Sequence, residues 1–213
     1  MSPVFSESRA ACPRTLCAPV LLEDSAYRFS RVSMGDALWW AALELVDVTY
    51  RQQGLPVSPA ADPNLVRLCC ETREGVLVGT VGLRTDNFSC QRSFPEAFAH
   101  HVGTASAVEF TQFAVEGARD RRLAVTLRLL SLAFLQAREA NAHYMICEVR
   151  PAHASFYLQA GLQEVARRER EGWHPALFLV GAVKDVEAAL QQGSLQKRGL
   201  PLTNNHEGAS CFH

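Results

Sequence analysis

Three arginines lie close together where a predicted strand is followed by a predicted long helix. Arg119, Arg121 and Arg122 fall within four residues at the start of that helix. The first backbone N–H groups of a helix have no partner within it and can bind anions. Three cations at this end oppose the helix dipole, so they are unfavourable for the helix itself. We therefore interpret residues 113–124 as an anion-binding turn suited to a pyrophosphate or a phosphodiester. A solvated first turn with incidental arginines is the alternative.

A second segment that could take part in catalysis surrounds Tyr157, which lies in a short predicted helix directly after a strand. Its phenol could donate a proton at the point where two parallel strands separate. A tyrosine in such a helix is more often part of the core, so Tyr157 alone does not establish a site.

Hydrophobic periodicity predicts the elements that position these residues. Alternating apolar residues predict strands at 27–32, 65–71, 76–84, 107–115, 143–149, 162–169 and 176–183. Helical spacing predicts helices at 33–53, 94–101, 119–140, 152–160 and 183–190. The mixed order favours an α/β or α+β fold around one sheet, with a parallel, right-handed strand–helix–strand unit at 107–149.

The two ends of the chain differ in composition from its centre. Residues 1–25 are rich in proline, serine and cysteine without a sustained period, which predicts an extended or flexible arm. Residues 191–213 predict a polar tail. Residues 26–190 are then the single domain that a chain of 213 residues allows.

Composition excludes several classes of protein. The formal net charge is −1, so there is no global basic field to hold a nucleic acid. Hydrophobic residues make up 48% of the chain, enough for a substantial core. No uninterrupted apolar run approaches the roughly 18 residues that span a bilayer, so we expect no transmembrane segment.

The seven cysteines form no C-x-x-C pair, and the seven histidines do not supply ligands at metal-site spacing. We therefore expect free buried thiols in a reducing compartment rather than a metal or redox site. This favours a cytoplasmic protein without a metal.

Residues 119–124 read Arg–Asp–Arg–Arg–Leu–Ala, and residues 156–162 read Phe–Tyr–Leu–Gln–Ala–Gly–Leu. These segments resemble the two signature motifs of the GNAT-superfamily N-acyltransferases. Arg122 stands where the superfamily usually has glycine. The resemblance implies a GNAT-like mixed central sheet with a parallel, splayed strand pair, flanked by helices.

A narrower resemblance rests on four motifs in sequence order. They are Val–Gly–Thr at 78–80, Glu–Phe–Thr at 109–111 with a valine at 115, Arg–Pro–Ala–His at 150–153 before Phe–Tyr at 156–157, and His–Pro–Ala–Leu at 174–177. Over residues 27–183 the chain resembles the long-chain N-acyl amino acid synthases, which are similar in turn to acyl-homoserine-lactone synthases. Gln112 replaces an arginine of that group, Arg150 an asparagine and Ala152 an arginine.

This resemblance implies acyl transfer to an amine, with a role for several residues. Glu109 would accept the proton of the amine directly or through water; a surface carboxylate on a strand is the alternative. Backbone N–H groups near Phe113 and Val115 would polarise the thioester carbonyl. Tyr157 would protonate the departing sulfur.

The donor implied is an acyl-phosphopantetheine on an acyl carrier protein or on coenzyme A. Arg119, Arg121, Arg122 and the backbone N–H groups up to Ala124 would hold its phosphopantetheine arm. An acidic carrier protein could also bind the arginines of residues 167–170.

The acceptor implied is an amino acid or a similar small amine. Aromatic residues would line an apolar cleft for a long acyl chain, namely Trp39, Trp40, Phe88, Phe94 and Phe98. Simple packing of these rings in the core is the alternative. Two alternatives remain open at this point: a short-chain N-acetyltransferase that uses acetyl-coenzyme A, and a non-catalytic module that binds acyl thioesters.

Overall fold

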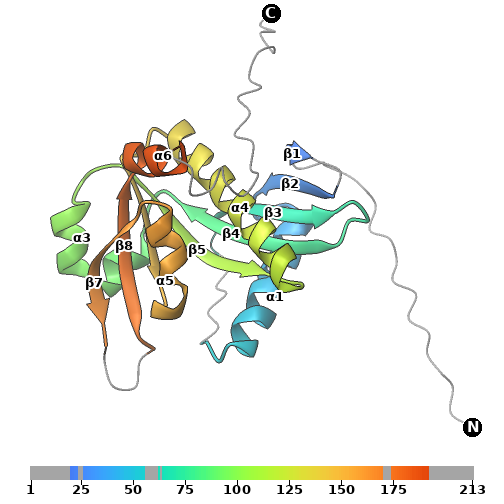
Figure 1. The fold of residues 1–213 in the computed structure, drawn as a ribbon, viewed down its shortest axis with the longest axis horizontal. Coiled ribbons are helices and arrows are strands. Elements are labelled where there is room, and N and C mark those ends of the chain that lie inside the picture. The colour runs from blue at the N-terminus through green and yellow to red at the C-terminus, as the bar shows by residue number, and fades with distance from the viewer. Residues whose placement is uncertain (1–19, 24–25, 56–61, 63, 170–173, 192–213) are drawn as a thin grey trace, which may run out of the picture.

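The strands predicted from the sequence pair, together with one short strand that was not predicted, into one mixed sheet in the computed structural model (Figure 1). The structure describes residues 20–23, 26–55, 62, 64–169 and 174–191. The strands are β1 (Val20–Glu23), β2 (Tyr27–Val32), β3 (Val66–Thr72), β4 (Leu77–Arg84), β5 (Ala107–Val115), β6 (Tyr144–Val149), β7 (Gln163–Arg168) and β8 (Ala176–Ala182). They lie in the order β1-β2-β3-β4-β5-β6-β8-β7.

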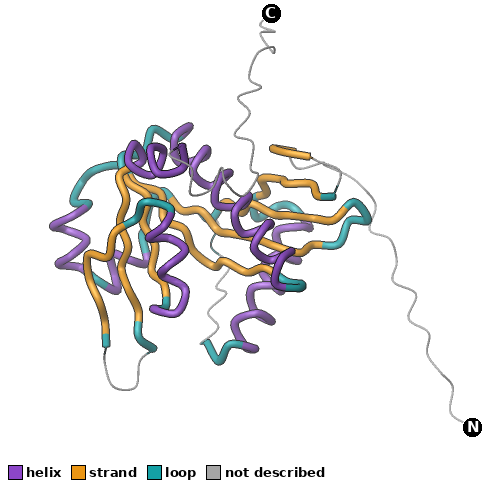
Figure 2. The backbone as a smooth tube through the Cα atoms, in the orientation of Figure 1, coloured by secondary structure: helices purple, strands orange, loops and turns teal. Residues whose placement is uncertain are grey.

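Helices cover both faces of this sheet (Figure 2). Those in the described residues are α1 (Ala37–Gln52), α2 (Ser89–Ser93), α3 (Pro95–His101), α4 (Arg119–Glu139), α5 (Pro151–Gln159) and α6 (Val183–Gln191). Core residues of α4, α5 and α6 form one cluster, whereas α1 packs elsewhere and α2 and α3 form a further cluster. Because neighbours in a strand face opposite sides, Cys70 of β3 packs in the first cluster and Cys69 with Trp39 of α1.

The sheet contains one parallel pair, β5 with β6, joined by the crossover helix α4. These strands pair from Ala107 with Tyr144 to Phe110 with Cys147 and no further. Beyond that point β5 continues beside β4, and β6 continues beside β8. The predicted α/β sheet with a splayed parallel pair is therefore confirmed.

Local sequence explains most element boundaries. Pro151 begins α5, where its missing N–H costs nothing, and Gly161 follows the helix at a φ of 96°. The helix predicted from residue 33 begins at Ala37 instead, with Asp36 as N-cap. The Asp36 carboxylate accepts a hydrogen bond of 2.8 Å from the backbone N–H of Ser33.

Three features differ from the sequence prediction. The short elements β1 and α2 were not predicted, because four or five residues carry too little periodicity to detect. Alternation along 107–115 predicts one buried and one exposed face, but β5 is buried over its first four residues, since helices cover both faces there. Most of the predicted arm 1–25 and all of residues 192–213 lie outside the described residues, so the domain boundaries stay a prediction.

Candidate active site

A cleft of about 640 Å³ lies where β5 and β6 diverge. Its walls come from the end of α1, the second half of β5, the start of α4, the end of β6, and α5. The residues before β8 complete it. A cleft at the open end of a parallel pair is a common position for a ligand site in α/β folds.

A β-bulge shapes the β5 wall of the cleft. Between the pairs of Thr111 with Gly82 and Ala114 with Thr80, β5 has two residues where β4 has one. Gln112 takes a φ of 50° to accommodate the extra residue. A non-glycine residue in this left-handed region costs on the order of 1 kcal/mol or more and is enriched at functional sites. Gln112 and Phe113 have no assigned partner on β4 and face the cleft.

Two tyrosines line the cleft. Tyr157 comes from α5, and burial raises its pKa, so the phenol stays protonated and can donate. Burial also raises the pKa of Tyr50, from the end of α1, to about 12. A hydrogen bond with the backbone of Phe113 and the charge of Arg67 act in the opposite direction.

Glu109 is fully buried, and donors surround its carboxylate. It accepts hydrogen bonds from the backbone N–H groups of Ser89 at 2.8 Å and Cys90 at 2.9 Å, and from the Ser89 hydroxyl. Arg84 lies 3.6 Å away as an ion-pair partner. The carboxylate therefore caps α2, and Ser89 lies between it and the cleft, which Ser89 lines.

The structure places some of the residues predicted to bind the acyl donor in the cleft and others outside it. Phe113, Val115 and Arg122 line the cleft. Arg119, Arg121 and Ala124 are exposed in the first turns of α4 but are not among the lining residues.

Among the residues that the structure describes, the charged lining of the cleft is mainly positive. Arg122, Arg150 and Arg168 line it together with one carboxylate, Glu148. Arg168 binds Glu148 at 2.7 Å. The Arg150 guanidinium donates to the carbonyl of Gln53 at 3.3 Å and lies 3.2 Å from a ring nitrogen of His174. This excess of cations over carboxylates suits an anionic ligand.

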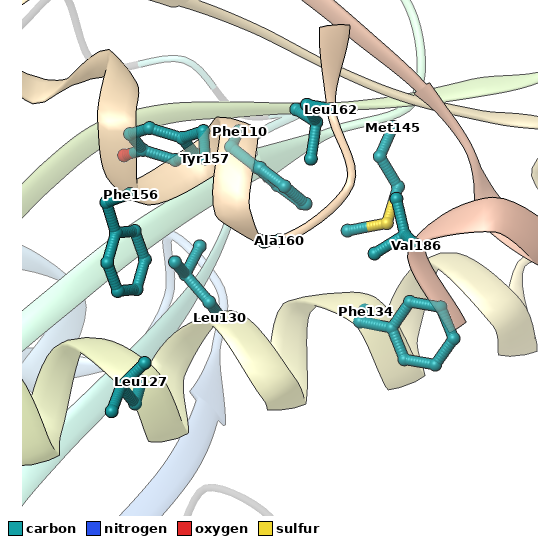
Figure 3. Close-up of a pocket in the computed structure, with 10 residues that line it drawn as sticks. All are labelled: Phe110, Leu127, Leu130, Phe134, Met145, Phe156, Tyr157, Ala160, Leu162 and Val186. Carbon is teal, nitrogen blue, oxygen red and sulfur yellow. The ribbon is translucent and has the colours of Figure 1, made fainter. Parts of the chain in front are cut away.

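A second, apolar cavity of about 20 Å³ lies between β5, β6 and helices α4 to α6 (Figure 3). Phe110, Phe156 and Tyr157 line both this cavity and the cleft, so they separate the two. Figure 3 shows the Tyr157 hydroxyl pointing away from the apolar cavity.

The aromatic residues predicted to line an acyl cleft lie elsewhere, and that prediction is wrong. Trp39 is buried under α1, while Phe94 and Phe98 pack on Phe178 across the sheet face covered by α2 and α3. The Phe88 ring packs on Phe98, and Trp40 is 49% exposed. Apolar character alone did not indicate which face of the sheet each ring would occupy.

Sequence reasoning missed Arg67, which is fully buried beside the bulge and donates to Gln112. The signal was present: Arg67 stands between Val66 and Leu68, in the apolar part of a predicted strand. It also missed Tyr50, because the contact of α1 with the bulge forms only in the folded chain.

Within the described residues, no cluster of three or more His, Cys, Asp or Glu side chains is arranged to hold a metal ion. The cysteines described, at positions 69, 70, 90 and 147, are buried and free. In the same part of the chain, no helix is both long enough and apolar enough to span a membrane.

Comparison with known proteins identifies the family. The family model described as N-acyl amino acid synthase FeeM matches residues 41–173. The chain therefore belongs to the FeeM family of N-acyl amino acid synthases and is an N-acyltransferase, an enzyme that transfers an acyl group to an amine. A search of curated protein sequences gave no significant match.

Solved structures share the fold. FeeM, an N-acyl amino acid synthase from uncultured soil microbes, aligns with a TM-score of 0.65 at 19% identity over 76% of this chain and 95% of its own. BjaI, described as a coenzyme A-dependent acyl-homoserine lactone synthase, aligns at 0.57 with 15% identity over 76% and 87%. The acyl-homoserine lactone synthase LasI aligns at 0.56 with 13% identity over 78% and 94%.

Proposed function

We propose that the protein transfers an acyl group from a phosphopantetheine thioester, carried by coenzyme A or an acyl carrier protein, to the amine of an amino acid. One observation carries this proposal: the bulge of β5, the phenol of Tyr157 and a cationic wall converge where β5 and β6 diverge. The family membership independently supports acyl transfer to an amine.

The donor enters along the cationic side of the cleft. Arg122 and the free N–H groups at the start of α4 bind its phosphates. The thioester then lies beside the bulge, where backbone N–H groups near Phe113 and Val115 polarise its carbonyl. Arg119 and Arg121 add charge at the same helix end without lining the cleft.

The chemical step forms a C–N bond and breaks a C–S bond. The amine nitrogen attacks the thioester carbon, and the tetrahedral intermediate expels a thiolate. The phenol of Tyr157 donates the proton that the sulfur needs. The proton lost by nitrogen passes through the Ser89 hydroxyl to Glu109, whose carboxylate already binds Ser89.

The apolar cavity receives the start of the acyl chain, because Phe110, Phe156 and Tyr157 border both spaces. A long chain requires these side chains and Leu130 to move, since about 20 Å³ holds little more than one water-sized group. That small volume favours a second candidate, transfer of a short acyl group such as acetyl from coenzyme A.

A donor panel tests the proposal and separates the two candidates. Acetyl, octanoyl, dodecanoyl and hexadecanoyl thioesters of coenzyme A and of an acyl carrier protein are incubated with the enzyme and an amino acid mixture. Mass spectrometry then identifies N-acyl products. We expect N-acyl amino acids from the longer donors; product from acetyl-coenzyme A alone supports the second candidate, and no product from any donor contradicts both.

A further inference from the structure

Arg67 of β3 is a buried cation without a carboxylate partner among the described residues. Its side chain is 0% exposed, and its Nε and Nη1 atoms have no hydrogen-bond partner there. Its closest described neighbours are uncharged at neutral pH. The Trp39 ring lies 5.0 Å from the guanidinium carbon, and burial raises the pKa of Cys69 and of Tyr50 to about 12. An isolated buried charge of this kind is costly unless another group compensates it.

The one hydrogen bond of the guanidinium within the described residues fixes the orientation of Gln112. Nη2 of Arg67 donates to Oε1 of Gln112. A guanidinium can only donate, so the amide must present its oxygen to Arg67 and keep both N–H donors for another acceptor. Gln112 is the bulge residue with positive φ, and it lines the cleft. The bulge therefore presents two amide donors with a buried cation behind them.

This arrangement lies beside the site of acyl transfer. Phe113, the next residue, lies in the stretch of β5 near which backbone N–H groups are proposed to polarise the thioester. The nitrogen of an α-amino acid is two bonds from its carboxylate carbon, so a carboxylate bound at Gln112 places the amine within reach of the thioester carbonyl. The other cations of the cleft are less suited to this task. Arg168 is paired with Glu148, and Arg150 is bound to Gln53 and His174. Arg122, the third lining arginine, is the residue proposed to bind the phosphates of the donor.

We propose that Gln112, oriented by Arg67, binds the carboxylate of the amino acid acceptor, with Arg67 as a positioning residue that also supplies the countercharge. This inference rests on the proposed function and specifies how its acceptor is recognised. It requires the acceptor to carry a carboxylate next to its amine, so a simple amine or an amino acid amide is a poor substrate.

The test compares an amino acid with its primary amide in matched variants. For the wild type we expect kcat/KM to be at least about tenfold higher for the amino acid, the effect of losing one charge-assisted hydrogen bond. Gln112→Met removes the donors and should erase the preference. Gln112→Glu still accepts from Arg67, which protects folding, but repels a carboxylate and should reverse the preference towards the amide.

The role of Arg67 is tested by the ratio of kcat/KM for the amino acid to kcat/KM for its amide, rather than by activity alone. Arg67→Met should lower the preference for the amino acid, and Arg67→Lys, which can still donate to Gln112, should restore part of it. Gln163→Glu introduces the same charge change at an exposed position of β7 and should leave the ratio unchanged. A purely structural role of Arg67 would reduce turnover of both acceptors equally and would overturn the proposal.

Binding measurements separate this inference from the proposed function. Isothermal calorimetry with the enzyme in the absence of an acyl donor should detect tighter binding of the amino acid than of its amide, and Gln112→Glu should abolish the difference. If no donor gives a product, the proposed function fails while calorimetry still decides the carboxylate site. A folded Gln112→Glu protein that keeps the wild-type order of acceptors overturns the inference.

Discussion

At the scale of single residues, the neighbours of each buried candidate group determine what that group can do. Tyr157 is surrounded by apolar side chains, so its phenol stays protonated and serves as a donor. Glu109 is also buried, yet three donors and Arg84 surround its carboxylate. The two buried residues therefore differ in their neighbours: the Tyr157 phenol keeps its proton, and the Glu109 carboxylate binds the Ser89 hydroxyl through which the proton of the amine is proposed to pass.

We expect Tyr157→Phe to lower kcat by about 100-fold while leaving KM for the donor nearly unchanged, because only proton donation is lost. Since burial raises the pKa of Tyr157, its phenol should stay protonated as the pH rises to about 9, so deprotonation of Tyr157 should not lower the wild-type kcat in this range. Steady-state kinetics from pH 6 to 9 measure both effects. Tyr144→Phe, in β6 outside the cleft, is the matched control, and an equal loss in both variants would contradict the assignment.

At the scale of elements, the position of α4 depends on close contact with β4. Gly79 lies in β4, and a Cβ atom there would stand 2.7 Å from Cγ1 of Val125 and 3.1 Å from Cδ1 of Leu129. Both partners belong to α4, whose first turn carries the arginines proposed to bind the donor. Glycine at this position therefore brings the anion-binding helix end close to the sheet.

We expect Gly79→Ala to lower the free energy of unfolding by about 1–3 kcal/mol through overpacking, and to raise the KM for the donor as α4 shifts. Urea denaturation and donor kinetics measure these effects. Gly35→Ala, where an added Cβ meets no atom within 4 Å, is the matched control. Unchanged stability and unchanged donor KM in Gly79→Ala would show that this contact does not position α4.

The order of elements could be predicted from the sequence, whereas the bulge could not. Alternation and helical spacing follow from local residue types, and a parallel crossover at 107–149 follows from strand–helix–strand order. The bulge arises because β5 has one residue more than β4 between two paired positions, which becomes evident only when the strands meet. The motif at 156–157 indicated Tyr157, but the partnership of Arg67 with Gln112 links residues 45 positions apart.

At the scale of the whole molecule, near-zero net charge conceals a local excess of cations. The chain carries a net charge of −1, yet arginines outnumber carboxylates among the described charged residues that line the cleft. We expect the KM for coenzyme A donors to rise several-fold between low salt and 0.5 M salt, because salt screens exposed charges. Arg122→Ala should weaken this salt dependence, and Lys184→Ala on α6 should not. A donor KM independent of salt would contradict electrostatic binding.

The buried thiols give the fold a second global property, sensitivity to alkaline pH. Burial raises the pKa values of Cys69 and Cys70 from 9.0 to about 12. Because the folded state keeps these protons longer than the unfolded state, their contribution to stability is complete below pH 9 and is lost as the pH rises towards 12. The slope is about 1.4 kcal/mol per pH unit for each group.

We therefore expect the free energy of unfolding, measured with urea under reducing conditions, to fall from pH 9 to pH 10.5. Cys69→Ala is less stable at neutral pH, because it leaves a cavity, but should lose stability less steeply with rising pH. Identical slopes in the two proteins would contradict the assignment to Cys69.

The central claim is that the cleft joins an acyl thioester to the amine of an amino acid. A single-turnover reaction with a long-chain acyl thioester and an amino acid, in which free thiol and N-acyl product are quantified in the same sample, tests it directly. We expect one N-acyl amino acid for each thiol released, and both to fall together in Tyr157→Phe. Thiol release without an N-acyl product, or no release from any donor, would contradict the claim.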